Sequence, residues 1–361
     1  MSGPARFDLS RDDADAARRA AAAALDRGEL VVVPTETLYG LAGRADLPAA
    51  RQRLDALKGN RTTPYSVAVA SPGTLSEWLL PPFRTARRIA ARWWPGPVTQ
   101  LLPDHAGELV GVRVPGHAWT RALLETVGAP VLLPSANRSG QPAPRSLDEL
   151  APDVAAAAAV LVDGGRCALG EASTVVEPRL ACLRVVREGV VTRDDLRRHA
   201  EPLVLLVCTG NTCRSPMAES LLRRALAKAA ADDASLLLPR VLSAGMHAED
   251  GEPPSPEAVE VLGQMGLDLS DHSTRSLRDD ELRRADVVFG MGRSHVLAVE
   301  ERLTGLARED RPEVALFDPE GHDVDDPFGS DVARYLSVAR MLERLAARRA
   351  EQLLAPRRPV P

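Results

Sequence analysis

The stretch PLVLLVCTGNTCRS, residues 202–215, decides how the second half of this 361-residue chain folds. Its unbroken apolar run up to Cys208 is typical of a fully buried strand, and a helical pattern follows over 216–230. A short loop from a strand to a helix N-terminus directs backbone N–H groups at one point, which favours an anion there. The sequence therefore predicts a phosphate-binding loop with the Cys208 thiol at its centre.

The residue types of this loop suit phosphoryl transfer. The field that attracts an anion also favours the thiolate, the nucleophilic form of cysteine. Arg214 can hold two phosphate oxygens through its planar guanidinium, and the hydroxyl of Ser215 can support the thiolate. Gly210 and Asn211 tolerate the positive φ that a tight loop requires. The leaving group needs an acid. The predicted catalytic residues are Cys208, Arg214 and the downstream Asp326, and the predicted phosphate loop is completed by Thr209, Gly210, Asn211, Thr212, Cys213 and Ser215.

Apolar runs alternate with helical patterns from this motif to the end of the chain. This alternation indicates βαβ units and a parallel sheet. Before the motif, the short apolar runs are less regular, and a polar helix over 192–200 is followed by Glu201-Pro202, which marks a boundary. The sequence predicts an α/β protein of two domains, residues 1–200 and residues 201–361.

Residues 203–352 resemble the low-molecular-weight protein tyrosine phosphatase family. The resemblance implies a four-stranded parallel sheet flanked by helices and a phosphocysteine intermediate on Cys208. It also implies that water hydrolyses this intermediate, with Asp326 switching from acid to base, and that neither a metal nor a cofactor is required. The segments that carry it are CTGNTCRSPMAE (208–219), VLSAG (241–245), GLDLSDHSTR (266–275), ADVVFGM (285–291) and DDPFG (325–329).

The resemblance leaves the substrate open between phosphotyrosine and phosphoarginine in proteins. Tyrosine-directed members usually have a bulky aliphatic residue where this chain has Thr212, whereas Thr212 and Phe328-Gly329 look more like the protein-arginine phosphatases. Arsenate reductases share the loop but use further cysteines downstream, and none follows Cys213, which excludes them. Cys213 itself is either a partner in a protective disulfide or a small buried residue.

The first half carries polar segments at the ends of short apolar runs. Each segment alone fits a turn or a packing residue, but the ordered set indicates a site for a polar small molecule. The segments are PTETLYGL (34–41), Lys58 with Arg61, WPGPVT (94–99), VRVP (112–115), PSANRSG (134–140), DGG (163–165), STVV (173–176) and REG (187–189).

In this order, residues 12–192 resemble the YrdC family of threonylcarbamoyl-adenylate synthases. The family implies an open α/β fold with a concave basic cavity, in which L-threonine, bicarbonate and ATP give threonylcarbamoyl-AMP and pyrophosphate. It also implies Mg²⁺ with the ATP, and tRNA or tRNA-modification proteins as partners, because the product serves a tRNA adenosine modification (t6A). The resemblance places Thr35 and Thr37 in the threonine pocket, sets Lys58, Arg61 and Arg113 against carboxylate and phosphates, and assigns the nucleotide to Ser135, Asn137, Ser173 and Arg187.

The segment Lys58-Gly-Asn-Arg61 departs from this family, whose members usually show Lys-x-Arg. Either the long Arg61 side chain reaches the same place, or one phosphate contact is lost at about 1–3 kcal/mol. Only Lys58 and Lys228 are lysines among 45 basic residues, so the composition of this chain strongly favours arginine. If Lys58 were only a solvated charge, we would expect arginine at this position. We therefore expect an active synthase; the alternative is a noncatalytic module that binds nucleotide or RNA.

Composition excludes several other classes of protein. Residues 1–200 carry 25 basic and 22 acidic groups and residues 201–361 carry 20 and 28, so neither half has the strong basic excess of a nucleic-acid binder. Four cysteines without a CxxC pair are too few for a disulfide scaffold or a structural zinc site. No apolar run reaches the roughly 18 residues of a membrane span, and the polar N-terminus is unlike a secretory signal.

We expect a cytoplasmic bifunctional enzyme without membrane contact. A further alternative is two unrelated activities, each kept in full after a cut near residue 200.

Overall fold

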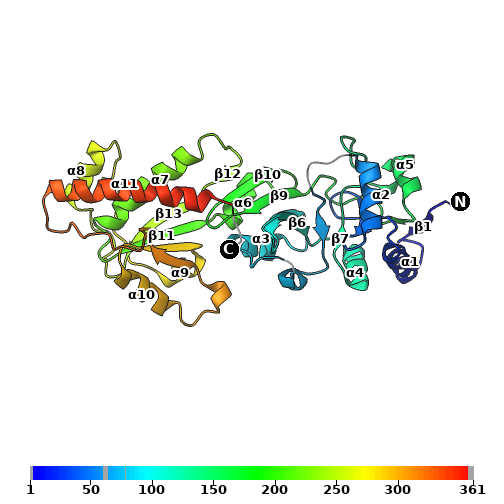
Figure 1. Cartoon of the computed structure of the whole chain (residues 1–361), viewed down its shortest axis with the longest axis horizontal. Coiled ribbons are helices and arrows are strands. Elements are labelled where there is room, and N and C mark those ends of the chain that lie inside the picture. The colour runs from blue at the N-terminus through cyan, green and yellow to red at the C-terminus, as the bar shows by residue number, and fades with distance from the viewer. Residues whose placement is uncertain (1–2, 60–63, 78, 357–361) are drawn as a thin grey trace.

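The computed structural model describes residues 3–59, 64–77 and 79–356 of the chain. The molecule is elongated, with the N-terminus at one end, and helix α11 (Val332–Leu354) runs from the far end back to the middle (Figure 1). An eleven-stranded sheet and a four-stranded sheet form its two halves. Within the described residues, no helix is both long and apolar enough to cross a membrane.

The eleven-stranded sheet mixes parallel and antiparallel pairs. In spatial order its strands are β1 (Ala5–Asp8), β8 (Val160–Asp163), β2 (Val31–Val33), β3 (Gly40–Arg44), β7 (Val131–Leu132), β4 (Val67–Ala68), β6 (Leu109–Arg113), β5 (Val98–Pro103), β9 (Thr174–Pro178), β10 (Leu183–Arg187) and β12 (Leu236–Leu237). The accompanying helices are α1 (Ala14–Asp26), α2 (Pro48–Lys58), α3 (Arg84–Trp93), α4 (Ala118–Val127), α5 (Pro152–Ala157) and α6 (Arg193–Ala200). The predicted α/β class is confirmed for this half.

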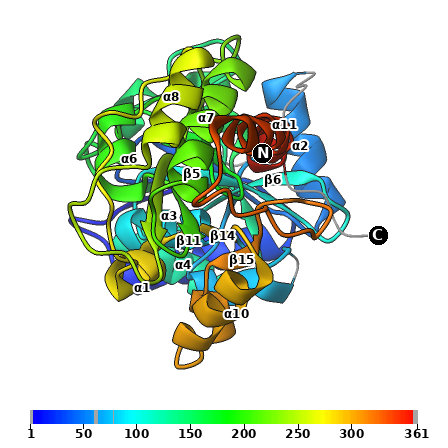
Figure 2. The ribbon, with the colours of Figure 1, turned by 90° about the vertical axis from the view of Figure 1, so that its left-hand side faces the viewer.

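The four-stranded sheet is entirely parallel, as predicted. Its strands, in spatial order, are β13 (Arg240–Gly245), β11 (Leu203–Cys208), β14 (Val287–Gly290) and β15 (Glu313–Leu316). Its helices are α7 (Arg214–Ala229), α8 (Pro256–Gln264), α9 (Asp279–Arg284), α10 (Arg293–Arg302) and α11. Helices α7, α8 and α11 cover one face and α10 lies on the other (Figure 2).

Strand β11 explains why this half folds around the motif of residues 202–215. All six of its residues are buried. Because successive side chains of a strand point to opposite faces, Val204 and Leu206 join the core beneath α7 and α11, while Leu205 and Val207 join the core on the α9 and α10 side. An apolar run without alternation is therefore required, and it fixes Cys208 at the carboxyl end of a central strand.

The two halves are joined by more than the peptide bond at residue 200. Strand β12, from the second half of the sequence, pairs antiparallel with β10, with Leu183 opposite Leu237. Ala181 and Cys182 pack in the core of the second half. The division at residues 200 and 201 stays a prediction, and hydrogen bonding and core packing cross it.

Helix α3 makes a second connection between the halves. The side chain of Asp286, just before β14, is fully buried and accepts two hydrogen bonds from Arg88, of 2.9 and 2.8 Å. It also accepts from the Thr85 hydroxyl at 2.9 Å and from the Leu203 N–H at 2.8 Å. Arg84 of the same helix donates to the backbone carbonyl of Arg283. A helix of the first half is therefore anchored at the base of the parallel sheet of the second.

Candidate active sites

The loop between β11 and α7 closes around the sulfur of Cys208. The Sγ atom accepts a hydrogen bond from the Asn211 N–H at 3.2 Å and lies 3.0 Å from the Ser215 hydroxyl oxygen. Because α7 begins at Arg214, the positive end of a helix also lies at the loop. This geometry can stabilise a thiolate and an anion beside it. The loop residues surround a hollow of about 250 Å³ whose lining is Cys208, Thr209, Gly210, Thr212, Cys213, Arg214, Asp326 and Phe328.

Asn211 holds the loop in shape. It has a φ of 58° and is fully buried. Its amide donates to the hydroxyls of Ser215 and Ser243, both at 2.9 Å, and its side-chain oxygen accepts from the Arg275 N–H at 3.0 Å. Gly210, expected to share the positive φ, does not adopt it, because a single left-handed residue completes the turn.

Arg214 and Asp326 face each other across the hollow. The guanidinium is almost completely buried and donates to the Asp326 carboxylate, and also to the Val324 carbonyl at 3.4 Å. The Asp326 side chain is 49% exposed, and the Phe328 beside it is 73% exposed. Because both groups line the hollow, an anion bound there would compete with the Asp326 carboxylate for the guanidinium.

Two histidines contact the loop without having been predicted. His272 Nε2 donates to the Asn211 carbonyl at 2.9 Å, and His295 Nε2 lies 3.0 Å from the Thr209 hydroxyl oxygen. Burial, followed by the charge of Arg214, lowers the pKa of His295. His272 lies within the quoted segment 266–275 and His295 lies four residues after the end of the segment 285–291, so both were within reach of sequence reasoning. What the sequence did not reveal was the direction of their side chains.

Cys213 is buried beside the loop and is not joined to Cys208. Its Sγ atom lies 2.9 Å from the Ser255 hydroxyl oxygen and 3.2 Å from the Tyr335 hydroxyl oxygen. All four cysteines are free thiols. These contacts fit the interpretation of Cys213 as a small buried residue, and its oxidation stays untested.

A cavity of about 280 Å³ lies in the first half, between the ends of several strands. Its charged lining residues are both arginines, in keeping with the expected basic character. Of nine residues predicted here from the first half, the seven that line the cavity are Thr35, Thr37, Arg113, Ser135, Asn137, Ser173 and Arg187. Residues more than 150 positions apart in the sequence are therefore brought to one place.

Lys58 lies behind the wall of this cavity and binds two of its lining residues. It is the last residue of α2 and is 4% exposed. Its ammonium donates to the Ser135 carbonyl at 2.6 Å and to the Asn137 side-chain oxygen at 3.0 Å. Arg61, the other half of the irregular segment, lies outside the described residues.

Arg113 is oriented by a carboxylate that was quoted in the sequence but not predicted as a site residue. Glu36 accepts from its guanidinium at 2.5 Å, and the Thr37 hydroxyl does so at 2.9 Å. On the neighbouring strand β5, the Thr99 hydroxyl shares a hydrogen bond of 3.0 Å with the Ser173 hydroxyl. Thr99 was also missed, although it ends the quoted segment of residues 94–99.

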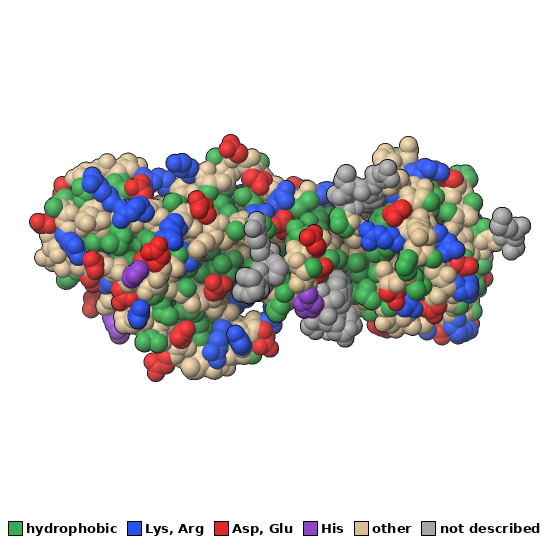
Figure 3. All heavy atoms as spheres, viewed as in Figure 1, with side chains coloured by type: hydrophobic (Ala, Val, Ile, Leu, Met, Phe, Trp, Pro, Cys, Tyr) green, Lys and Arg blue, Asp and Glu red, His purple; other side chains and the backbone are tan. Residues whose placement is uncertain are grey.

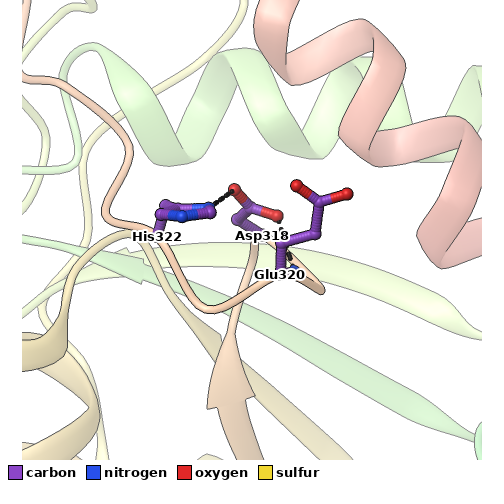
Figure 4. A group of neighbouring side chains, drawn as sticks. All are labelled: Asp318, Glu320 and His322. Carbon is purple, nitrogen blue, oxygen red and sulfur yellow. Dashed lines mark hydrogen bonds and ion pairs between the residues drawn. The ribbon is translucent and has the colours of Figure 1, made fainter.

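Apart from both sites, three potential metal ligands lie together on the loop after β15. Asp318, Glu320 and His322 each offer a ligand atom within 4.8 Å of the others (Figure 4). His322 lies 3.2 Å from Asp318, and Glu320 forms an ion pair with Arg348 at 2.8 Å. Asp318 and Glu320 therefore already have partners within the described part of the chain.

Comparisons with known proteins match the two halves separately. The family model described as low molecular weight phosphotyrosine protein phosphatase matches residues 203–357. The Escherichia coli low molecular weight protein-tyrosine-phosphatase Etp is 32% identical over 152 residues, which cover 42% of this chain and 93% of that relative. The model described as telomere recombination, for Sua5, YciO and YrdC, matches residues 23–189. A Mycobacterium leprae relative named "Putative threonylcarbamoyl-AMP synthase" is 36% identical over 198 residues, covering 52% of this chain and 89% of the relative.

A loop centred on a thiol at the end of a parallel sheet, together with a polar cavity in a mixed sheet, is the architecture of an α/β protein with two candidate active sites. The chain belongs to both the Sua5/YrdC family and the low molecular weight phosphotyrosine protein phosphatase family. The threonylcarbamoyl-AMP synthase of Bacillus subtilis is 33% identical over 207 residues, which are 54% of this chain. The chain spans only 59% of the length of that relative.

Proposed function

We propose that this chain is a bifunctional enzyme. Residues 1–200 would form threonylcarbamoyl-AMP and pyrophosphate from L-threonine, bicarbonate and ATP, and residues 201–361 would hydrolyse phosphorylated protein side chains. The observation that carries the proposal is that the three predicted catalytic residues of the second half line one hollow, and that seven of the nine residues predicted in the first half line one cavity. Membership of the two families supports the assignment.

The phosphatase step starts at the sulfur of Cys208. The thiolate attacks phosphorus, the bond to the leaving group breaks, and Asp326 protonates the departing oxygen or nitrogen. Arg214 holds the phosphoryl oxygens, and the Ser215 hydroxyl and Asn211 N–H support the sulfur while it carries charge. Asp326 then takes a proton from water, which attacks phosphocysteine and releases phosphate and thiolate.

For the substrate of this step we favour phosphoarginine in proteins, with phosphotyrosine as the second candidate. Thr212 lines the hollow, where its hydroxyl is able to orient a guanidinium or a water. The exposed ring of Phe328 is suited to stack on either a guanidinium or a phenyl group. The name of the Escherichia coli relative supports the second candidate.

Replacing the nucleophile tests the phosphatase mechanism directly. Cys208→Ser should abolish turnover of a phosphoprotein because the serine hydroxyl is a far weaker nucleophile in this loop. Binding of orthovanadate or phosphate should persist, since the N–H groups and Arg214 remain. Turnover by Cys208→Ser would refute the thiol mechanism. Cys182→Ser, at a buried thiol far from the loop in sequence, is the control.

In the first half, substrate charge would be met by arginines. Thr35 and Thr37 would bind threonine, Arg113 its carboxylate, and the walls at Ser135 and Ser173 the nucleotide. The attack at the α-phosphorus of ATP needs positive charge more than a nucleophilic side chain, because pyrophosphate leaves. Lys58, already bonded to the cavity wall, would contribute by holding Asn137 in place.

The cavity does not provide a protein site for Mg²⁺. Its described lining offers hydroxyl, amide and carbonyl oxygens and no carboxylate. Mg²⁺ in nucleotide enzymes is held by one or two carboxylates together with phosphate oxygens and water. Here the ion would depend on the ATP phosphates, and none of the steps above passes through it.

The rival function for the first half is a noncatalytic module that binds nucleotide or RNA. The deciding experiment measures threonylcarbamoyl-AMP and pyrophosphate from the Cys208→Ser chain, in which the phosphatase is silent. Threonine-dependent product should form, and Lys58→Ala should remove it because the ammonium ties Ser135 to Asn137. Lys228→Ala, at the exposed second lysine, should leave it unchanged. Folded protein without product would establish the rival.

We also propose a cytoplasmic location and a supply of product to tRNA modification. The free thiols support the former, since disulfides are rare in reducing compartments. The chemistry of the proposed product supports the latter, with tRNA or tRNA-modification proteins as the partners.

A further inference from the structure

A second polar pocket, of about 180 Å³, lies where the two halves meet. It is formed by the ends of α6 and α9 and the beginnings of β11 and β13, together with α3. The residues that line it are Arg88, Arg197, Arg198, His199, Glu201, Leu203, Arg240, Leu242, Glu281 and Arg284. Neither proposed reaction uses this pocket.

Some of its charges are neutralised by neighbours. Arg88 binds the buried Asp286, Arg198 binds Asp195 at 2.7 Å, and Glu281 binds Arg275. These pairs neutralise three of the charged side chains of the lining.

Three arginines remain. The side chains of Arg197, Arg240 and Arg284 are exposed, and they make no hydrogen bond or ion pair with any described residue. The carboxylate of Glu201 is the one acidic group of the lining that is not paired within the described residues. Elsewhere, on the face in Figure 3, basic and acidic side chains are interspersed. The pocket therefore concentrates positive charge at the junction.

Helix ends explain only part of this concentration. Arg197 lies in the last turn of α6 and Arg284 in that of α9, where a cation complements the helix dipole. Arg240 lies at the start of a strand, where no such effect applies. Nor does the dipole explain why three separate elements, two from the second half and one from the first, direct arginines into one pocket.

We propose that the junction pocket binds a small phosphate-rich anion of the diphosphate class, either inorganic pyrophosphate or the terminal phosphates of a nucleoside triphosphate. Each guanidinium can hold two phosphate oxygens in a planar fork, so three of them match the oxygen-rich ends of a diphosphate. The volume suits a small anion. The binding rests on the pocket alone; only its link to the pyrophosphate released by the synthase rests on the proposed function.

Binding there has a physical consequence for the junction. The anion bridges α6 of the first half to β13 and α9 of the second. A ligand that binds only the assembled pocket stabilises the folded chain. Pyrophosphate should therefore raise the melting temperature in a way that depends on these arginines.

The test compares two double variants of the full chain by titration calorimetry with inorganic pyrophosphate. Arg240→Gln with Arg284→Gln removes two pocket charges, and Arg340→Gln with Arg344→Gln removes two exposed charges of α11 as a matched control. The phosphate loop and the first cavity are intact in both, so their own anion binding cancels. The pocket variant should lose one binding event or weaken it at least tenfold, and the control should equal the unmodified chain. Identical isotherms for all three would overturn the proposal.

Further arms identify the source of the anion. The same three proteins are then titrated with ATP, AMP and orthophosphate. If the binding of ATP, but not of AMP or orthophosphate, depends on Arg240 and Arg284, the ligand is a nucleoside triphosphate. If the binding of ATP does not depend on these arginines, the ligand is pyrophosphate. If the double variant Arg240→Gln with Arg284→Gln weakens the binding of a short RNA duplex but not that of pyrophosphate or ATP, the proposal is overturned. The Lys58→Ala chain should still bind pyrophosphate in a way that depends on Arg240 and Arg284, whether or not the synthase assignment is right. A failure of the pocket proposal is therefore distinguishable from a failure of the synthase assignment.

Discussion

Arg88 and Asp286, 198 residues apart in the sequence, meet in two hydrogen bonds of 2.9 and 2.8 Å. The Asp286 side chain is completely buried, whereas Arg88 keeps 29% of its side chain exposed. A buried carboxylate is tolerated only when its charge and its hydrogen bonds are satisfied. The first half of the chain supplies the arginine that allows the second half to bury this group.

We predict that Asp286→Ala lowers the free energy of unfolding of the full chain by about 3–5 kcal/mol, because it leaves Arg88 without its charge partner. Urea denaturation measures this change. Asp310→Ala removes an exposed partner of Arg87, in a pair at 3.1 Å, and should cost about 1 kcal/mol or less. Equal losses for the two variants would contradict a special role for the buried pair.

We predict that Asp326→Ala slows hydrolysis by about 10²–10⁴-fold for poor leaving groups and least for good ones. The reason is that a good leaving group departs without a proton. Steady-state rates with a series of aryl phosphates measure the dependence. Asp325→Ala is a close control, because the neighbouring carboxylate binds Arg334 at 2.7 Å and does not line the hollow. A uniform loss across the series would rule out the acid role.

We predict that Thr212→Ile moves preference from phosphoarginine toward phosphotyrosine by about tenfold, a difference of about 1.4 kcal/mol. The substitution removes a hydroxyl from the lining and adds apolar surface that favours a phenyl ring. The ratio of kcat/KM for matched phosphoarginine and phosphotyrosine peptides is the measurement. Thr212→Ser keeps the hydroxyl and should keep the ratio. An unchanged ratio in Thr212→Ile would remove the reason for favouring arginine.

We predict that His295 makes stability fall as the pH drops below about 6.5. Its pKa is lowered in the folded chain by burial and by Arg214, against the opposing charges of Asp323 and Asp326. The unfolded chain then takes up a proton that the folded chain refuses. Stability from this group is complete above the ordinary histidine pKa and declines below it, by up to about 1.4 kcal/mol per pH unit.

Urea unfolding between pH 7.5 and 5.5 measures this slope, and His295→Asn should reduce it. Burial also lowers the pKa of His117. This histidine is present in both the unmodified chain and the His295→Asn variant, so its contribution to the slope is the same in both. A slope that does not change in His295→Asn would show that the titration of His295 is not coupled to folding.

Sequence reasoning succeeded where the signal is local. The polar helix expected over residues 192–200 is α6, which begins at Arg193 because Thr192 is its N-cap and forms a capping box with Asp195. The cavity residues, from Thr35 to Arg187, were assigned through the resemblance to the YrdC family, which rests on short polar segments in a fixed order along the chain.

It failed where a residue depends on a distant partner. Asp286 is the second residue of the quoted segment ADVVFGM, yet nothing local shows that α3 supplies Arg88 to it. Glu36 gives no sign that it turns toward Arg113. Strand β12 has two residues, too few for any periodicity, and pairs with β10 across the predicted domain boundary.

The pairing of β10 with β12 also orders events during synthesis. Domains generally fold as units from the N-terminus while the chain grows. Here the first sheet has an open edge at β10 until Leu236 and Leu237 have been made, and an uncovered edge strand invites pairing with other chains. A chain that ends between residues 200 and 236 would therefore leave the edge of β10 uncovered, so two residues of the second half protect an edge strand of the first.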